Sequence, residues 1–222
     1  MNALITGGTK GVGKATSELL QSFGWNVVCW GRQELFTPDI FASRLLDSGW
    51  IPDALVLCAG EWFSKPEVEQ SWWDYEHHLG ILGNHWRLMH RLLPFLERTQ
   101  GCVIGVASTR AFIGGVETGP YSVAKAGLVA MMQGYAREYN KGIRFNCVCS
   151  GLVDTELGAE VVRTGGAKPG APMLKPEDVA RVIVGLIEKK NENGKVVRIV
   201  ADRGRSPDIG YAEWVWTGDT DR

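Results

Sequence analysis

Two side chains that can move protons lie four residues apart in this chain, at Tyr121 and Lys125. On a helix this spacing places both on one face, one turn apart. A phenol transfers protons poorly at neutral pH unless a nearby cation favours its ionised form. The hydroxyl of Ser108 directly follows an apolar run at residues 102–107 that indicates a strand. The three residues together predict a proton-transfer site, although the pair alone is also typical of an amphipathic helix.

A glycine-rich turn lies near the start of the chain, between a short apolar run at residues 2–6 and a helical pattern from residue 12. Glycines at 7, 8, 11 and 13 let the backbone bend sharply and let a diphosphate approach. The free N–H groups and the dipole of the following helix then attract the anion. This order of strand, turn and helix is typical of the nucleotide-binding opening of a doubly wound α/β fold. The same turn can also be only a tight connection.

These motifs, in this order, resemble those of the classical short-chain dehydrogenase/reductase family. They are Thr6-Gly7-x-x-x-Gly11-x-Gly13, Ser108 and Tyr121-x-x-x-Lys125. Three further segments match at near-family spacing, residues 55–60, 143–155 and 176–180, so that the resemblance covers roughly residues 2–202. It implies one doubly wound Rossmann-type α/β domain over residues 1–222, with a parallel sheet flanked by helices.

The resemblance also implies the roles of individual residues. Tyr121 would exchange a proton with the oxygen of a ketone or secondary alcohol, and Ser108 would hold that oxygen. Lys125 would hold the ribose of a nicotinamide dinucleotide and favour the ionised phenol, and hydride would pass between nicotinamide and the carbonyl carbon. The expected cofactor-binding residues are Gly7, Thr9, Lys10, Gly11, Val12, Gly13, Arg32, Asp39, Ile40, Ala59, Gly60, Tyr121, Lys125, Val153 and Thr155.

The residues after the second predicted strand bear on which dinucleotide fits. In this family an acidic residue there hydrogen-bonds the ribose 2′-hydroxyl and repels a 2′-phosphate. The chain has Trp30-Gly31-Arg32 at this point, without a carboxylate. Arg32 can grip a 2′-phosphate, and Lys10 is a second cation within reach. The resemblance therefore favours NADP(H) over NAD(H), although two solvated surface cations would give the same pattern.

Apolar runs alternate with helical patterns along the chain, which predicts parallel strands joined by crossover helices. We expect strands near residues 2–6, 26–30, 53–58, 102–107, 143–149 and 195–200. We expect helices near residues 12–23, 40–48, 67–78, 80–98, 119–139 and 176–190. The crossover between Gly31 and Asp39 is abbreviated, and the resemblance implies a short strand there. Asp39-Ile40 then matches the family's acidic pair near the adenine, but Asp39 can equally begin a helix after Pro38.

Three places depart from the family pattern. The position of the family's catalytic asparagine falls near Gly80 or Ile81, and Asn84, one turn later, is a possible substitute or a surface residue. Cys58 replaces the asparagine of an Asn-Ala-Gly signature, and Ser150 replaces a proline. We interpret the last two as structural substitutions.

Other reactive or aromatic residues have structural interpretations. Helical spacing scatters the four histidines, and we expect neither a metal site nor a carboxylate partner for them. The four tryptophans between residues 62 and 86 either line the active-site region or pack in the core or a subunit contact, and we favour packing. Trp214 and Trp216 can cover a substrate pocket or a neighbouring subunit. The histidines are His77, His78, His85 and His90, and the earlier tryptophans are Trp62, Trp72, Trp73 and Trp86.

Composition narrows the class of protein further. The chain has 222 residues and a formal net charge of −1, without a basic patch for nucleic acid. We find no signal peptide and no apolar run long enough to cross a bilayer. The five cysteines lie in or beside strand-like segments, which indicates buried thiols in a reducing cytoplasm.

The segment that would cover the substrate, about residues 155–174, is rich in glycine and proline, so we expect a mobile loop there and a short tail at 203–222. The expected function is an NADP(H)-dependent oxidoreductase acting on a ketone or secondary alcohol, as a cytoplasmic homodimer or homotetramer by family analogy. The alternative is a catalytically silent NADP(H)-binding regulator or scaffold. The sequence names neither the substrate nor the direction of reaction.

Overall fold

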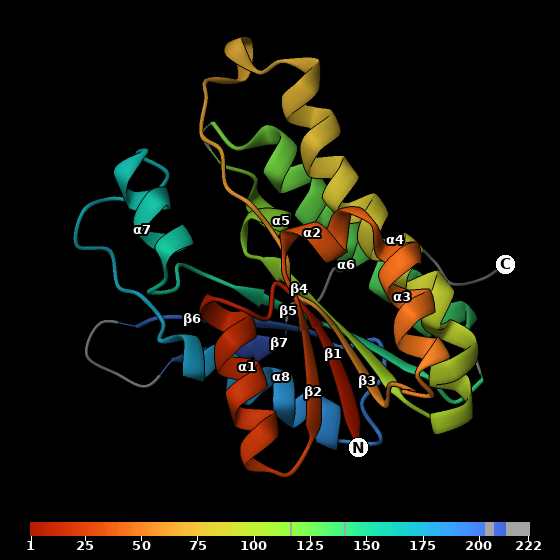
Figure 1. The fold of residues 1–222 in the computed structure, drawn as a ribbon. Helices are drawn as coiled ribbons and strands as arrows, with labels where there is room; N and C mark the ends of the chain where they lie inside the picture. Colours follow the sequence, from red (N-terminus) through yellow and green to blue (C-terminus); the bar gives the residue numbers. More distant parts are fainter. Residues whose placement is uncertain (116, 140, 203–206, 212–222) are drawn as a thin grey trace, which may run out of the picture.

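A central parallel sheet organises the protein, seen here in a computed structural model that describes residues 1–115, 117–139, 141–202 and 207–211. Its strand order is β2-β1-β3-β4-β5-β6-β7, and only β7 runs antiparallel to its neighbour in the described sheet (Figure 1). The strands are β1 (Asn2–Thr6), β2 (Asn26–Trp30), β3 (Ala54–Leu57), β4 (Cys102–Ser108), β5 (Arg144–Ser150), β6 (Val196–Val200) and β7 (Asp208–Tyr211). Trp214 and Trp216 lie outside the described residues.

Helices cover both faces of this sheet (Figure 1). Those described are α1 (Gly11–Ser22), α2 (Arg32–Phe36), α3 (Pro38–Asp47), α4 (Trp72–Thr99), α5 (Arg110–Ile113), α6 (Gly119–Glu138), α7 (Glu156–Arg163) and α8 (Pro176–Glu188), with a 3₁₀ turn at Glu67–Glu69. The doubly wound α/β class expected from the sequence is therefore confirmed.

Alternation along the strands builds two apolar cores, one on each side of the sheet. In β1, Leu4 packs in the core beneath α3, α4 and α6, whereas Ala3 and Ile5 pack in the core beneath α1 and α8. All three side chains are fully buried. Burial of a large apolar side chain stabilises the fold by about 1.5–3 kcal/mol, so these continuous apolar runs fix the strands that carry the site.

The abbreviated crossover forms a helix instead of the short strand implied by the resemblance. Residues 32–36 form α2, and the Glu34 carboxylate accepts a hydrogen bond from the Gly31 N–H at 2.9 Å. Asp39 lies in the first turn of α3, after Pro38, and forms an ion pair with Arg87. The local capping contact of Glu34 thus favours a helical turn where the family pattern suggested an extended segment.

The region expected to hold two helices at 67–78 and 80–98 contains one long helix, α4, after the short 3₁₀ turn. Ser71 and Asp74 form a reciprocal capping box at its start, with Asp74 N–H bonded to Ser71 Oγ at 3.3 Å. Gly80 does not break the helix, and an added Cβ there would meet nothing within 4 Å. The sequence expectation also missed α5, α7 and β7.

The site lies where the order of successive strands across the parallel sheet changes direction. β1 pairs with β2 on one side and with β3 on the other, so the connections after β1 and β3 leave in opposite directions. Ligands of open α/β sheets bind at such a switch point, outside the carboxyl ends of the strands. Gly7 follows β1 at this edge, and Gly60 follows β3.

Candidate active site

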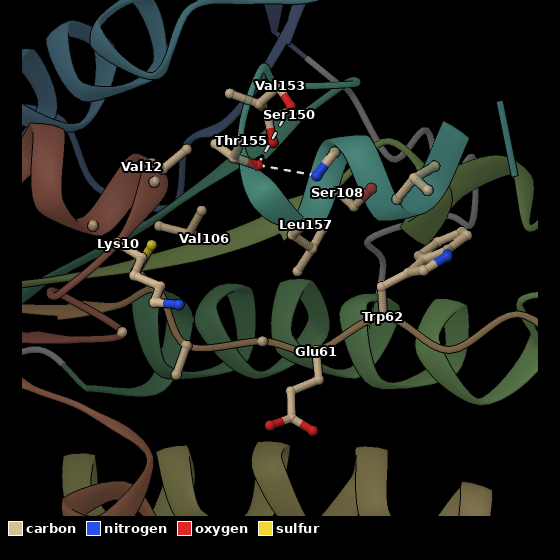
Figure 2. A pocket seen from close by; sticks show the side chains of 18 of the residues that line it. Lys10, Val12, Glu61, Trp62, Val106, Ser108, Ser150, Val153, Thr155 and Leu157 are labelled. Atoms are coloured by element: carbon tan, nitrogen blue, oxygen red, sulfur yellow. Dashed lines mark hydrogen bonds between the residues drawn. The ribbon is translucent and has the colours of Figure 1, made fainter. Parts of the chain in front are cut away.

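A cavity of about 820 Å³ opens at the carboxyl ends of β1, β3, β4 and β5. Figure 2 shows Lys10 and Val12 on one side of it, Trp62 on the other, and Ser108 and Thr155 between them. The sequence-predicted residues that line it are Gly7, Thr9, Lys10, Gly11, Val12, Gly13, Arg32, Ala59, Gly60, Ser108, Tyr121, Lys125, Val153 and Thr155. Segments far apart in the chain therefore meet in one cavity.

The three candidate catalytic side chains are brought to this cavity by β4 and α6. Ser108 ends β4, and Tyr121 lies in the first turn of α6, directly after Pro120. Ser108, Tyr121 and Lys125 are each less than a tenth exposed. The Lys125 ammonium lies 5.7 Å from the centre of the Tyr121 ring and donates a hydrogen bond to the Val106 carbonyl at 2.9 Å. A cation thus lies beside the phenol, as the one-turn spacing predicts.

The glycine-rich turn is shaped for close approach of an anion. Gly7 has φ of +66°, and a Cβ there would lie 2.9 Å from the Ala59 Cα. At Gly13 a Cβ would lie 2.2 Å from the Gly7 carbonyl oxygen. The Lys10 side chain bonds Glu156 at 2.7 Å and does not cap α1, so the N–H groups of the first turn of this helix remain available. These features fit the diphosphate of a dinucleotide.

Thr6 joins this turn to the segment after β3. Its Oγ1 accepts hydrogen bonds from the N–H groups of Cys58 at 3.0 Å and Ala59 at 3.2 Å. The hydroxyl proton is left with two acceptors in reach, His85 Nε2 at 3.2 Å and the Val56 carbonyl at 3.4 Å. Burial raises the pKa of the nearby Cys58 thiol to about 11, so that this substitution leaves an inert thiol in the cavity wall.

The segment after β5 closes another side of the cavity. Thr155 begins α7, and its Oγ1 accepts a hydrogen bond from the Gly158 N–H at 3.0 Å (Figure 2). Thr155 also packs near the turn, since a Cβ at Gly11 would lie 3.0 Å from its methyl carbon. Val153 forms a bridge with Leu174, which ties the two ends of the segment together. The expected loop thus contains a helix; its mobility stays a prediction.

Glu61, in the cavity lining, contacts both Arg32 and His77. Its carboxylate accepts bonds from Arg32 at 2.5 Å and from His77 Nε2 at 2.6 Å. The expectation that no carboxylate partners the histidines was therefore wrong. The carboxylate lies sixteen residues before His77 in sequence, on a different segment, so helical spacing on α4 could not reveal the contact. Among the described residues, no group of three histidine, cysteine or acidic side chains is arranged to hold a metal ion.

Three candidate residues lie away from the cavity. Asp39 pairs with Arg87 and is half exposed, Ile40 is exposed, and neither lines the cavity. Asn84 is buried in α4, but Ile81 is the residue of that helix that lines the cavity. The structure thus separates these three from the other predicted residues.

Trp62 forms an apolar wall beside the candidate phenol. Its ring lies edge-on to Tyr121 at 5.1 Å between centroids, and its Nε1 donates to Thr164 Oγ1 at 2.9 Å. Val161, on α7, packs in the same cluster. The sequence interpretation favoured core or subunit packing for this tryptophan, and it is indeed buried in this apolar cluster, but it also lines the cavity. Its nearness to Ala59 and Gly60 in sequence was the signal available.

A second, water-sized cavity of about 20 Å³ lies behind Tyr121 and Lys125. It is lined by His78 and His85 among other residues. Burial, followed by the charge of Lys125, lowers the pKa of His85 to about 3. Burial, followed by the neighbouring His77, lowers the pKa of His78 to about 4. Both imidazoles are therefore neutral at physiological pH.

The buried histidine predicts how stability depends on pH. The unfolded chain protonates a histidine below about pH 6.5, whereas folded His85 stays neutral down to about pH 3. Neutral His85 therefore makes its full contribution to the free energy of unfolding above pH 6.5. This contribution decreases by about 1.4 kcal/mol per pH unit as the pH falls toward 3. We expect His85→Asn to flatten the slope of unfolding free energy between pH 6 and 4 in urea titrations. His90→Asn, at an exposed position, is the control, and an unchanged slope in His85→Asn would contradict the assignment.

Comparisons with known proteins identify relatives of this chain. A family model described as enoyl-(acyl carrier protein) reductase matches residues 47–206. A relative named acetoacetyl-CoA reductase, from Synechocystis sp., is 26% identical over 88% of this chain and 93% of its own length. A Thauera aromatica relative, named as a subunit of (2S)-[(R)-hydroxy(phenyl)methyl]succinyl-CoA dehydrogenase, is 33% identical over 42% of this chain and 40% of its own.

Solved structures share the fold. A short-chain dehydrogenase/reductase from Brucella melitensis superposes with a TM-score of 0.81 at 21% identity, covering 92% of this chain and 97% of the other. A gluconate 5-dehydrogenase assigned as NAD(P)-dependent, from Beutenbergia cavernae, has bound NADP at low occupancy. It has a TM-score of 0.79 at 21% identity, over 89% of this chain and 94% of the other. Within the described residues, no helix is long and apolar enough to cross a membrane.

Proposed function

Because the chain belongs to the short-chain dehydrogenase/reductase family and is an oxidoreductase of that type, we propose that it uses NADP(H) to interconvert a ketone and a secondary alcohol. Tyr121 is the general acid and base in this proposal. The observation that carries it is the single cavity in which Ser108, Tyr121 and Lys125 face the glycine-rich turn. The turn accepts a diphosphate, and the three side chains lie where a proton must be exchanged.

The chain's own residues orient the substrate oxygen and move its proton. The chemistry that a bound nicotinamide supplies is hydride transfer at carbon. Tyr121 donates its phenolic proton to the oxygen during reduction and accepts it back during oxidation. Ser108 donates a second hydrogen bond to the same oxygen, so that its charge is stabilised as it develops. Lys125, held by the Val106 carbonyl, places a positive charge 5.7 Å from the centre of the Tyr121 ring.

The preference for NADP(H) is supported by charge at the end of the cavity near β2. Arg32 lines the cavity with a side chain that is about three-quarters exposed and bonded to Glu61. A 2′-phosphate carries more negative charge than that carboxylate and can recruit the guanidinium as a bidentate partner. Lys10 and Lys14 line the same end. The Beutenbergia structure, which has NADP bound at low occupancy, is consistent with this choice.

Replacing Arg32 tests the cofactor preference. We expect Arg32→Ala to weaken NADPH binding by about 10- to 100-fold, the value of one hydrogen-bonded charge contact, and to leave NADH binding within about threefold. Fluorescence titrations with both dinucleotides measure this. Arg44→Ala removes an exposed guanidinium that lies over Phe41 and does not line the cavity, so it should change neither affinity. Equal losses for NADPH and NADH would contradict recognition of the 2′-phosphate.

Turnover separates the enzyme from a silent cofactor-binding protein. NADPH oxidation over a panel of ketones and aldehydes should reveal activity with some members. Tight NADPH binding without oxidation on any compound, in either direction, would instead favour a regulator or scaffold.

We also propose a homo-oligomer, in which α4 and α6 form the contact as in relatives of this family. Exposed apolar side chains on these helices support it, with Leu79 and Trp86 on α4 and Val123 on α6. Sedimentation velocity should therefore show a dimer or tetramer.

A cytoplasmic location completes the proposal. Its support is that the five cysteines carry free thiols, as expected in a reducing compartment.

A further inference from the structure

Arg110 lines the main cavity, and its backbone lies beside the hydroxyl of Ser108. It is the first residue of α5, and its backbone N–H donates to Ser108 Oγ at 3.2 Å. Its side chain then extends toward the segment that carries α7. The Nη1 group donates to the Gly114 carbonyl at 3.2 Å, and Nη2 donates to the Gly166 carbonyl at 2.8 Å. The guanidinium therefore has a defined position between two loops.

This position lies at the end of the cavity where Trp62 stands. Gly166 packs directly on that ring, because a Cβ added to it would lie 2.4 Å from a Trp62 ring carbon. The Trp62 ring in turn contacts Tyr121 at 5.1 Å between centroids. Lys10 and the glycine-rich turn lie on the opposite side of the cavity (Figure 2). The guanidinium is thus on the side of the phenol and away from the diphosphate site.

The cations near the glycine-rich turn are paired with carboxylates, whereas Arg110 near Trp62 has no carboxylate partner among the described residues. Glu156 pairs with Lys10, and Glu61 pairs with Arg32. Within the described part of the chain, Arg110 forms no ion pair, and its side-chain acceptors are the two carbonyl oxygens. A guanidinium has five N–H donors, so three of those of Arg110 have no protein acceptor among the described residues.

The surroundings make an anion the matching ligand. Trp62, Leu152, Val161 and Ala167 form an apolar cluster with Tyr121 at this end. In such a low-dielectric site a charged hydrogen bond is stronger than in water. The planar fork of an arginine matches the two oxygens of a carboxylate. A neutral ketone would leave these donors without a charged partner.

We propose, on the basis of the function proposed above, that Arg110 binds a carboxylate of the substrate, and that the substrate class is keto acids and the corresponding hydroxy acids. The carbonyl lies between Ser108 and Tyr121, and the carboxylate lies against the guanidinium. The apolar wall of Trp62 and Val161 covers the carbon chain between them. Arg110 is thereby a specificity-determining residue, and its two carbonyl bonds hold it in the binding position.

A matched pair of substrates tests this assignment. Keto acids of increasing chain length are compared with their primary amides, which keep the skeleton and remove the charge, in wild type, Arg110→Met and Arg110→Lys. We expect wild type to favour the best acid over its amide by at least about 30-fold in kcat/KM, as one charged bond provides. Arg110→Met should lower kcat/KM for the acid by about 100-fold, mostly through KM, and change the amide by less than about threefold. Arg110→Lys should recover part of the loss.

Binding provides a second readout that does not depend on turnover. Calorimetry of the same acids with the protein saturated in NADP⁺ should show binding to wild type that Arg110→Met loses. Equal losses for acid and amide would mean that Arg110 only fastens the α7 segment, and would overturn the proposal. Oxidation of NADPH with neutral ketones but neither turnover nor binding of acids would also overturn it, while leaving the proposed function intact. Absence of NADPH binding and of all turnover would instead refute the proposed function itself.

Discussion

Tyr121→Phe is expected to lower kcat by at least about 1,000-fold, because among the described residues it removes the only phenolic proton that lines the cavity, while it keeps the ring. The Phe ring retains the packing against Trp62 at 5.1 Å and His78 at 5.9 Å, so the fold should persist. NADPH affinity should stay within about threefold, because Lys125 and the glycine-rich turn are unchanged. Stopped-flow NADPH oxidation gives the rate, and fluorescence titration gives the affinity.

A matched control is available on the same helix. Tyr135 packs on Phe145 at 5.3 Å between ring centroids and does not line the cavity. Tyr135→Phe should therefore leave kcat unchanged. If Tyr121→Phe keeps activity within tenfold of wild type, another group supplies the proton and the assignment of the acid is wrong.

Gly13→Ala is expected to abolish cofactor binding, with a loss of NADPH affinity of at least about 100-fold. A Cβ at this position would lie 2.2 Å from the Gly7 carbonyl oxygen, so either the turn or the start of α1 must move. That movement displaces the N–H groups that face the diphosphate. Overpacking of this kind costs about 1–3 kcal/mol, which lowers the melting temperature by about 3–10 °C. Thermal unfolding and NADPH titration report the two effects separately.

Gly185→Ala supplies the control for a glycine-to-alanine change in a helix. Gly185 lies in α8, and an added Cβ there would meet nothing within 4 Å. This variant should be more stable by about 0.5–1 kcal/mol and bind NADPH as wild type does. NADPH affinity within threefold of wild type in Gly13→Ala would show that the turn does not hold the diphosphate.

The parts of the fold that the sequence predicted are those fixed by local patterns. The apolar runs at residues 2–6 and 26–30 match β1 and β2. In β1 every residue after Asn2 is buried, which leaves a continuous apolar signal, whereas the edge strand β2 is only partly buried. The long helix α4 was expected as two helices near residues 67–78 and 80–98, but the chain continues through Gly80 as one helix. The helix in place of a strand at 32–36 depends on one side-chain contact of Glu34, which a family pattern does not encode.

The residues of the candidate site also fall into two groups, those with a local sequence signal and those brought together only by the tertiary fold. Motif residues such as Gly13 and Tyr121 carry their own signal, because their spacing specifies a turn and a helix face. Contacts such as Glu61 with His77, or Arg110 with the Gly166 carbonyl, join segments that only the tertiary fold brings together. Asp39 matched the family's acidic pair near the adenine; the structure places it in the first turn of α3, outside the cavity lining, where it pairs with Arg87. Sequence patterns do not show which distant segments come into contact in the folded protein.

The most direct measurement follows a labelled hydrogen through one turnover. NADPH carrying deuterium in both positions at nicotinamide C4 is incubated with the protein and a reducible keto compound, and the product is analysed by mass spectrometry. We expect an alcohol that has gained one deuterium on the carbinol carbon, and formation of this labelled product at least about 1,000-fold more slowly with Tyr121→Phe. Bound NADPH that retains its label while every substrate remains unreduced would contradict it.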